Sequence, residues 1–279
     1  MPLPEITLAH PSGSRARVSP YGAHVLSFVP AGGDEALFLS RGSQFQEGTA
    51  IRGGIPVIFP QFSSSGPLPR HGFARNRFWH AIPGLPGIDS EGRPQAAFEL
   101  LPDQAIRALW PRSFLARLTL SLAADSLSVR LSVANSGEVP LEFTAALHTY
   151  LRLADASLAR LHGLSSCSWR DHLGDATRRL SPDSAPLQPA MSIDRSYFDV
   201  PASLLLEDPA AARKFKISSA GFPDAVVWNP WVEGIRKLAD MVEGEHLEML
   251  CVEAAALSPV HLKPGEIWSG TQTIQVLSC

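Results

Sequence analysis

Glu253 is the residue of this 279-residue sequence whose surroundings most strongly suggest chemistry. It lies in the segment 248–257, where Leu250, Cys251 and Val252 precede it and three alanines follow it. A carboxylate in the middle of an apolar strand is costly unless it is paired or neutralised. Burial also raises the pKa of a carboxyl group toward the range in which it can act as a base near neutral pH. Two interpretations are open here: a general base, or a buried glutamate that pairs with an arginine for structural reasons.

His148 is the second candidate, in the segment 141–152 with the sequence LEFTAALHTYLR. As a strand, this segment would place His148 on a face that carries several hydrogen-bonding groups. A lone histidine in a strand is most often a structural hydrogen-bonding group. The polar residues on the same face favour a catalytic role only modestly. The residues expected on its face are Glu142, Thr144, Ala146, Tyr150 and Arg152, opposite Leu141, Phe143, Ala145, Leu147 and Leu151.

The third candidate is the segment 51–75, which glycine and proline interrupt every few residues. These interruptions exclude a helix and make a poor strand. The segment is nevertheless rich in arginine and aromatic residues, which indicates an ordered loop, and such loops often carry binding groups. A proline-rich connection whose arginines cover the surface explains the composition equally well.

Several common chemistries find no support in the sequence. It contains no G-x-S-x-G elbow, no Walker A loop, no G-x-G-x-x-G and no H-E-x-x-H. The nine histidines are dispersed, and three cysteines without C-x-x-C spacing argue against a disulfide framework or a zinc site. We therefore expect an acid/base site that uses no metal and no cofactor.

Composition limits the partners and the compartment. The 24 Lys and Arg stand against 27 Asp and Glu, a net charge of −3 without a basic run, so we expect binding to neither nucleic acid nor membranes. Only four of these 24 basic residues are lysines. Arginine is the bidentate partner of phosphates and carboxylates. A biased base composition of the gene nevertheless explains the excess of arginine more simply. We expect no signal peptide, no membrane span and a cytoplasmic location, because no suitable apolar stretch is present.

The elements that must position these groups are predicted to be short strands. Apolar and polar residues alternate over 114–122 and again over 127–133, which predicts an antiparallel hairpin with one buried face. The best helix candidate is Val232–Val242, and the 24 Pro and 21 Gly suit many tight turns. We expect an all-β fold, one large antiparallel β-sandwich with few short helices, in a single domain of residues 1–279. Further strands are predicted at 5–9, 15–19, 24–29, 35–39, 96–101, 203–206, 213–219, 224–228, 249–255 and 267–277.

Seven short blocks, in this order, carry a resemblance to a known family. Through them the chain resembles the hexose-6-phosphate mutarotases (glucose-6-phosphate 1-epimerases), a branch of the aldose 1-epimerase or galactose-mutarotase-like superfamily. The likeness runs from about residue 20 to the end, and the pairing of RGGIP with HGFAR, followed by WNPW and CVE, is specific. The blocks are Arg52-Gly-Gly-Ile-Pro, Arg70-His-Gly-Phe-Ala-Arg75, Leu147-His-Thr-Tyr150, Val227-Trp-Asn-Pro-Trp231, Asp240-Met241, Cys251-Val-Glu253 and Leu262-Lys-Pro-Gly-Glu266.

The resemblance implies a β-supersandwich and an isomerase that interconverts the anomers of glucose 6-phosphate and related hexose 6-phosphates. In this family the histidine of the LHTY block protonates the ring oxygen, and the glutamate of the CVE block takes the proton of the anomeric hydroxyl. Carried over, these are His148 and Glu253. Arg52 and Arg75 match the family's phosphate-side arginines, and His71 is expected to line the same pocket.

Other expected contacts are less well matched to the family. Arg70 stands where an uncharged residue is expected, and it either adds a third phosphate contact or faces solvent. Asp171 corresponds to a carboxylate that binds sugar hydroxyls, but its segment departs from the usual form, so Asp175 is a rival. Trp228 and Trp231 either stack on the sugar or pack in the core.

Two other functions remain as alternatives. One is an aldose 1-epimerase for unphosphorylated sugars, and the other is a non-catalytic sugar-phosphate-binding protein. The intact pair His148 and Glu253 argues against the second, because a protein that only binds has no use for a buried acid and base. For the enzyme we expect a monomer whose ligand is a small sugar phosphate.

Overall fold

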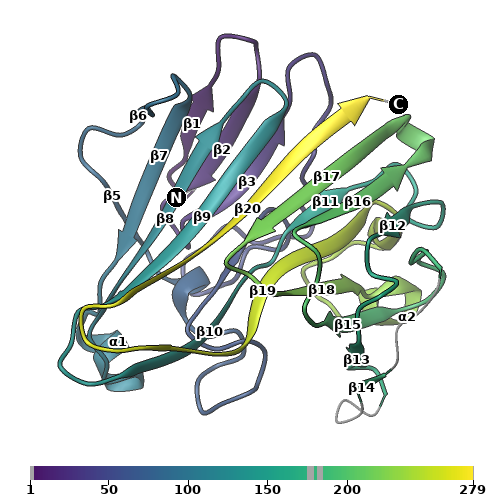
Figure 1. Ribbon diagram of the computed structural model, residues 1–279. Coiled ribbons are helices and arrows are strands. Elements are labelled where there is room, and N and C mark those ends of the chain that lie inside the picture. The colour runs from purple at the N-terminus through teal and green to yellow at the C-terminus, as the bar shows by residue number, and fades with distance from the viewer. Residues whose placement is uncertain (1–2, 175–178, 181–184, 279) are drawn as a thin grey trace.

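The computed structural model describes residues 3–174, 179–180 and 185–278, and most of its regular structure is β (Figure 1). The described strands form a nine-stranded, an eight-stranded and a three-stranded sheet, and every pairing between them is antiparallel. The three-stranded sheet has the order β1-β2-β3, with β1 at Ile6–Ala9, β2 at Arg15–Ser19 and β3 at His24–Val29.

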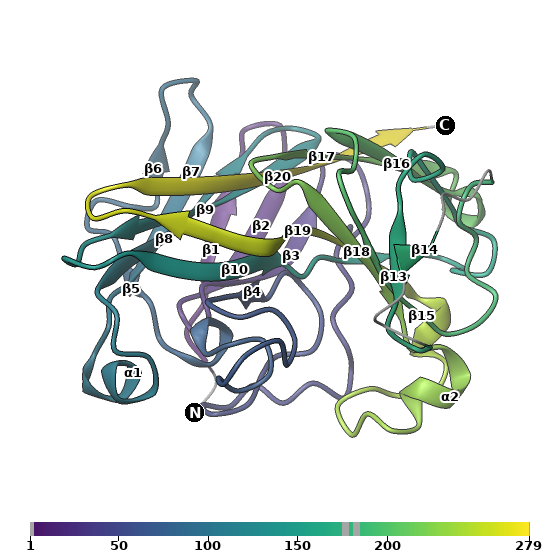
Figure 2. The same ribbon diagram turned by 60° about the horizontal axis from the view of Figure 1, so that its bottom comes forward.

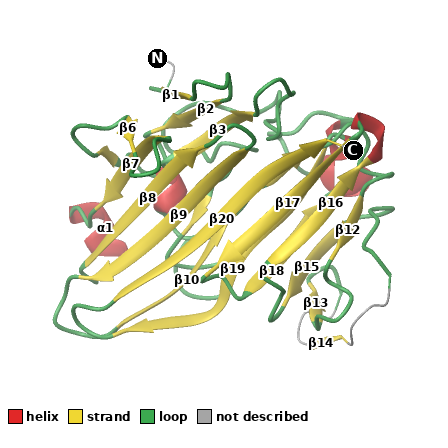
Figure 3. Ribbon diagram, turned by 45° about the horizontal axis from the view of Figure 1, so that its top comes forward, coloured by secondary structure: helices red, strands yellow, loops and turns green. Residues whose placement is uncertain are grey.

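The nine-stranded sheet has the order β12-β16-β17-β20-β9-β8-β7-β5, with β6 paired to β7, and Figure 3 shows its long strands side by side. The predicted hairpin forms its middle: β8 and β9 pair from Phe114 with Asn135 to Leu122 with Leu127. Its strands are β5 (His80–Ala81), β6 (Gly87–Ile88), β7 (Pro94–Leu100), β8 (Phe114–Leu122), β9 (Ser126–Asn135), β12 (Arg160–His162), β16 (Ser203–Asp208), β17 (Arg213–Ala220) and β20 (Ile267–Ser278).

The eight-stranded sheet has the order β14-β13-β15-β18-β19-β10-β4, with β11 also paired to β19. Figure 2 shows that α2 and loops from the first third of the chain lie on one side of it. Its strands are β4 (Val57–Ile58), β10 (Leu141–Leu147), β11 (Tyr150–Arg152), β13 (Trp169–Asp171), β14 (Arg179–Leu180), β15 (Ile193–Tyr197), β18 (Asp224–Asn229) and β19 (Met249–Leu262).

The large sheets bury one hydrophobic core between them, which confirms the predicted β-sandwich. Alternate residues of β8, such as Leu118 and Leu120, are fully buried in the same cluster as Leu147 and Val227 of the other sheet. The three-stranded sheet adds Phe28 to this cluster. Burying such a side chain contributes about 1.5–3 kcal/mol, so the core holds the sheet that carries the site in a fixed position.

Short elements differ more from the sequence expectations. The helix predicted over 232–242 is only α2 (Trp231–Ile235), because the buried Glu245 carboxylate accepts a hydrogen bond from the Val242 backbone and holds the following chain in turns. A helix α1 (Gln104–Leu109) was not expected; its buried residue is Ile106. The strand predicted at 35–39 is wrong, since this segment makes only isolated bridges. The 3₁₀ turns are η1 (Ala74–Asn76), η2 (Pro209–Ala211) and η3 (Glu245–Leu247).

Candidate active site

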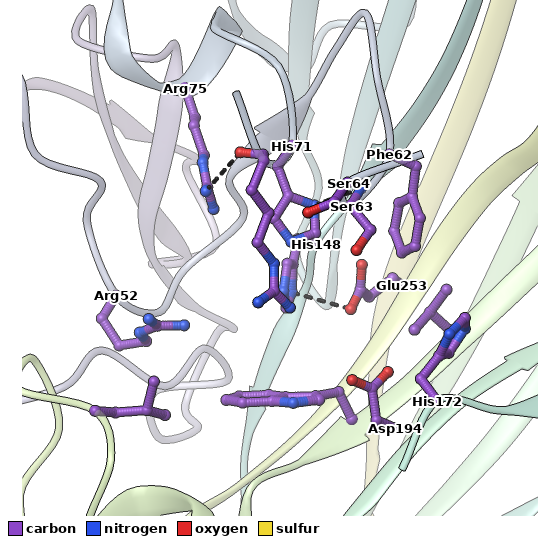
Figure 4. Close-up of a pocket in the computed structure, with 14 residues that line it drawn as sticks. Arg52, Phe62, Ser63, Ser64, His71, Arg75, His148, His172, Asp194 and Glu253 are labelled. Atoms are coloured by element: carbon purple, nitrogen blue, oxygen red, sulfur yellow. Dashed lines mark hydrogen bonds and ion pairs between the residues drawn. The ribbon is translucent and has the colours of Figure 1, made fainter. Parts of the chain in front are cut away.

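A cavity of about 490 Å³ lies on the face of the eight-stranded sheet that is turned away from the core. Figure 4 shows arginines on one side of this cavity and the carboxylates of Glu253 and Asp194 on the other. Six of the seven residues predicted for the site line it. The lining consists of Arg52, Phe62, Ser63, Ser64, Arg70, His71, Arg75, His148, His172, Asp194, Val226, Trp228, Leu238 and Glu253.

His148 and Glu253 are cross-strand neighbours. The last pair between β10 and β19 is Leu147 with Ala254, and one step further along the same register His148 lies opposite Glu253. Directly opposed side chains on one face of a sheet are within reach of each other. The imidazole Nδ1 lies 3.2 Å from the carboxylate Oε1, and this contact appears as a dashed line in Figure 4.

The strand expected over 141–152 is interrupted at the acid/base pair. Between β10 and β11, the His148 backbone N–H continues the register of β10 with β4 and donates to the Pro56 carbonyl at 3.0 Å. The next residue, Thr149, turns its hydroxyl toward the interior, where it donates to Gln272 of β20. The His148 and Tyr150 rings therefore lie on the same face, as the alternation predicted, although the strand is not continuous.

Burial dominates the electrostatics of Glu253. The residue is 2% exposed, and its Oε2 has no hydrogen-bond partner among the described residues. Burial raises the pKa of this carboxyl well above its ordinary value, and the nearby Asp194 raises it further, while Arg75 and Arg70 oppose the shift. A carboxylate with a raised pKa is a stronger base than an exposed one.

The pKa of His148 moves in the opposite direction. Burial lowers it well below the ordinary 6.5, and His71, Arg75 and Arg52 lower it further. A protonated imidazole with a lowered pKa is a stronger acid. At rest, these shifts favour a neutral imidazole beside a protonated carboxyl group.

Aromatic contacts hold the His148 ring in place. It stacks on Tyr150 with 4.7 Å between ring centroids and 12° between planes. The ring of Trp228 lies 6.1 Å away nearly perpendicular to it, and the ring of His71 lies 5.9 Å away. An imidazole ring that is packed on three sides has little rotational freedom, which keeps its nitrogens aimed in fixed directions.

The two glycines after Arg52 are required by the backbone. Gly53 and Gly54 have φ of 110° and 62°, and a Cβ on Gly53 would lie 2.4 Å from the Phe38 carbonyl oxygen. Only glycine adopts such a turn without strain. The buried His24 donates from Nε2 to the Gly53 carbonyl at 2.8 Å and fixes the turn that presents Arg52 to the cavity.

Arg52 has partners that balance its charge. Its Nε and Nη2 lie 3.1 and 3.0 Å from Oδ2 of Asp240, and its Nη1 donates to the Tyr150 hydroxyl at 3.1 Å. The Asp240 carbonyl in turn accepts from Ser40, which also donates to the buried Glu245. Asp240 and Tyr150 lie within the family blocks, but only the structure shows that both hold Arg52.

Arg75 and Arg70 are not balanced in this way. Arg75 donates from Nη2 to the Arg70 carbonyl at 3.2 Å, and its buried Nε has no partner. Neither guanidinium forms an ion pair with a carboxylate of the described residues. Burial and the neighbouring Arg52 lower the pKa of Arg75. This end of the cavity therefore has unpaired positive charge, which suits a small multivalent anion such as a phosphate.

The carboxylate at the other end of the cavity is Asp194, which the sequence did not single out. Burial raises the pKa of Asp194, with His172 opposing the shift. His172 also lines the cavity, and its Nε2 lies 2.7 Å from the Ser196 hydroxyl. No alternation marked it in the sequence, because Asp194, Arg195 and Ser196 are three polar residues in a row.

Asp171 is the predicted site residue that does not line the cavity. It lies directly opposite Arg195 in the pairing of β13 with β15. Directly opposed residues have their side chains on the same face of a sheet, so Asp171 shares a face with Arg195. Arg195 follows Asp194 in the strand and therefore points to the other face. Asp171 thus faces away from the cavity. Its carboxylate accepts a hydrogen bond from the Leu173 backbone instead. The rival Asp175 lies outside the described residues.

The two tryptophans of the WNPW block have different positions. Trp228 lines the cavity, whereas Trp231 begins α2 and packs against His246 at 5.2 Å. The buried Asn229 between them donates to the His246 and Met249 carbonyls and accepts from the Trp231 N–H. Most of this block is therefore structural.

None of the helices in the described part of the chain has the length and apolar character needed to cross a bilayer. Nowhere in residues 3–174, 179–180 and 185–278 do three His, Cys, Asp or Glu side chains gather as a metal ion would require.

Comparison with known proteins gives a consistent result. The model of the family described as aldose 1-epimerase matches residues 4–275. A protein of Cenchrus ciliaris, provisionally named glucose-6-phosphate 1-epimerase, is 36% identical over 261 residues, which cover 91% of this chain and 79% of the relative. A protein of Escherichia coli with the same provisional name is 31% identical and covers 91% of this chain and 83% of its own. The crystal structure of a provisionally assigned mutarotase from Salmonella typhimurium superposes with a TM-score of 0.90, at 27% identity, over 100% of this chain and 92% of that chain.

Proposed function

The chain belongs to the aldose 1-epimerase family, and on that premise we propose that it interconverts the α and β anomers of D-glucose 6-phosphate and related hexose 6-phosphates. One observation carries the proposal: unpaired arginines open into the same cavity as a buried acid/base pair. The relatives named above support the choice of a phosphorylated hexose. The resulting activity is that of an isomerase.

In the proposed reaction Glu253 accepts a proton from the sugar while His148 donates one to it. The Glu253 carboxylate takes the proton of the anomeric hydroxyl while the His148 imidazolium gives a proton to the ring oxygen. The C1–O5 bond breaks and leaves the open-chain aldehyde. After rotation about C1–C2 the same two groups exchange protons in reverse, and closure on the other face gives the opposite anomer. Each positioned proton transfer contributes about 10²–10⁴-fold in rate.

The separation of charges in the cavity orients the substrate. We assign the phosphate to Arg75, Arg70 and Arg52, which places the anomeric carbon toward Glu253. Asp194, rather than Asp171, is the carboxylate assigned to the sugar hydroxyls, because only Asp194 faces the cavity. His71 lines the cavity next to His148, and Trp228 offers an apolar face to the sugar ring.

We also propose that the enzyme works as a monomer in the cytoplasm. Cys167 and Cys251 are buried free thiols, which agrees with a reducing compartment.

Magnetisation-exchange NMR on the anomers of glucose 6-phosphate tests the function. The protein should accelerate exchange well above the rate in buffer alone, and far more for glucose 6-phosphate than for glucose. Equal rates on both sugars, with an Arg75→Ala variant unaffected, would instead identify an epimerase of unphosphorylated sugars. Binding of glucose 6-phosphate without any acceleration would identify a non-catalytic binding protein.

A further inference from the structure

Gln272 is a polar residue inside the apolar core between the two large sheets. It belongs to β20 of the nine-stranded sheet and is 1% exposed. Its direct cross-strand neighbour Val129 and Ile274, two positions further along β20, both belong to the main hydrophobic cluster. An amide buried among such side chains is costly unless its nitrogen and oxygen form hydrogen bonds. The partners of this amide therefore indicate its role.

Both partners lie at the eight-stranded sheet, and each is the chain neighbour of a proposed catalytic residue. The amide oxygen accepts a hydrogen bond from the hydroxyl of Thr149, which directly follows His148. The amide nitrogen donates at 3.0 Å to the carbonyl of Val252, which directly precedes Glu253. Because a carbonyl only accepts, the orientation of the Gln272 amide is fixed, with its nitrogen toward Val252 and its oxygen toward Thr149.

The β-ladder has a gap at this point, and the amide fills it. In the register of β11 with β19, Thr149 lies opposite Val252, and the Val252 N–H donates to the Thr149 carbonyl at 3.0 Å. A hydrogen-bonded antiparallel pair normally has a second bond, from the other N–H to the other carbonyl. Here the Thr149 N–H donates instead to the Leu147 carbonyl at 2.9 Å, which forms a three-residue turn centred on His148. The Gln272 nitrogen takes the place of the Thr149 N–H as the donor to the Val252 carbonyl.

We propose that Gln272 is a positioning residue for the acid/base pair, because its amide holds the turn that carries His148 against the strand that carries Glu253. The inference rests on the proposed function, and it assigns Gln272 no contact with the substrate. The His148 Nδ1 and the Glu253 Oε1 lie 3.2 Å apart across the two chain segments. This separation depends on the turn keeping its place beside β19. A side chain of the opposite sheet therefore fixes the relative position of the two catalytic groups from behind.

Gln272→Met tests the proposal, because it removes both hydrogen bonds and keeps a side chain of similar length. In the anomer exchange of glucose 6-phosphate, kcat should fall about tenfold or more while KM changes little, since a misplacement of about 1 Å can cost about 10²-fold in rate. The control is Ile274→Ala, which removes buried packing on the same face of β20 and no hydrogen bond. It should lower the urea midpoint and leave kcat close to that of the parent. A parent-like kcat in Gln272→Met, or an equal loss in Ile274→Ala, would overturn the proposal.

Thr149 provides a second test that remains usable if Gln272→Met fails to fold. Thr149→Val keeps the shape of the side chain and loses the hydroxyl, whereas Thr149→Ser keeps the hydroxyl. We expect kcat to fall in the valine variant and to recover in the serine variant. Adding Thr149→Val to Gln272→Met should lower kcat little further, because both changes break the same hydrogen bond. A parent-like kcat in Thr149→Val, or fully additive losses in the double variant, would refute the shared role.

Amide hydrogen exchange gives a readout that does not depend on turnover. The Val252 N–H should exchange with solvent faster in Gln272→Met than in the parent, measured relative to the Leu118 N–H of β8, because the turn opens locally. This ratio should not change in Ile274→Ala. If the parent does not accelerate anomer exchange, the proposed function fails, and the hydrogen exchange alone decides whether Gln272 holds the turn. If the parent is active but neither kcat nor the ratio responds to Gln272→Met, the inference alone fails.

Discussion

Replacing Glu253 by Gln should lower activity and raise stability in the same molecule. Glu253 is 2% exposed, and burial raises the pKa of its carboxyl above the ordinary 4.5. A carboxyl whose pKa is raised by folding binds its proton more tightly in the folded state, so stability is lost as pH rises from 4.5 to the folded-state pKa. The loss is about 1.4 kcal/mol for each unit between the two pKa values. Gln has nearly the same shape and carries no titrating group, so the variant escapes this loss.

Urea unfolding between pH 4.5 and pH 8 measures the effect on stability. The difference in free energy of unfolding between Glu253→Gln and the parent should be smallest near pH 4.5 and should grow with pH in favour of the variant. In the same preparation, exchange of glucose 6-phosphate anomers should fall by about 10²–10⁴-fold, the usual contribution of one general base. Glu233, whose side chain is 78% exposed, supplies the control, because Glu233→Gln should show no such slope. A difference that does not change with pH, or activity near that of the parent, would contradict the role of Glu253.

Four other predictions give separate tests. Arg75→Ala should reduce kcat/KM for glucose 6-phosphate by about 10²-fold or more, since hydrogen bonds to charged groups contribute about 1.5–3 kcal/mol each; its effect on free glucose should be much smaller. Tyr150→Phe keeps the ring stack but loses the bond from its arginine partner, so the KM for glucose 6-phosphate should rise roughly tenfold with little change in kcat. Asp194→Asn should lower kcat/KM by about tenfold, while Asp171→Asn should stay within about twofold of the parent; the reverse order would restore Asp171 to the site. Gly53→Ala should cost about 1–3 kcal/mol of stability or more in urea unfolding, because φ is 110° and the added Cβ meets a carbonyl.

Most strands could be predicted because alternation is a local property of the sequence. β2 and β3 begin and end at the residues expected, and the hairpin of β8 and β9 was found from its pattern. The failures occurred where a distant partner decides the local structure. Glu245 limits α2 from outside the helix, and Glu35 binds the backbone N–H groups of Phe28 and Leu37, so its own segment forms no ladder.

The site was predictable residue by residue, but its arrangement was not. Alternation in 141–152 placed His148 on the correct face, and the family blocks pointed to both arginines, yet no local pattern gives the register between β10 and β19. That register is what brings His148 opposite Glu253. Asp171 shows the same limit, because a shift of one residue decides which face of the sheet receives a side chain. The roles of these residues stay predictions until the variants are measured.

Glu253 lies in β19 and His148 lies opposite it between β10 and β11, whereas Arg52 and Arg70 lie in loops and Arg75 lies in η1. Strand positions are fixed by the core, whereas loops in general tolerate more substitution, apart from the glycine turn that follows Arg52. The groups proposed for proton transfer and those proposed for phosphate binding therefore lie on different parts of the fold. Substitutions confined to the loops are expected to change which sugar binds while leaving His148 and Glu253 in register.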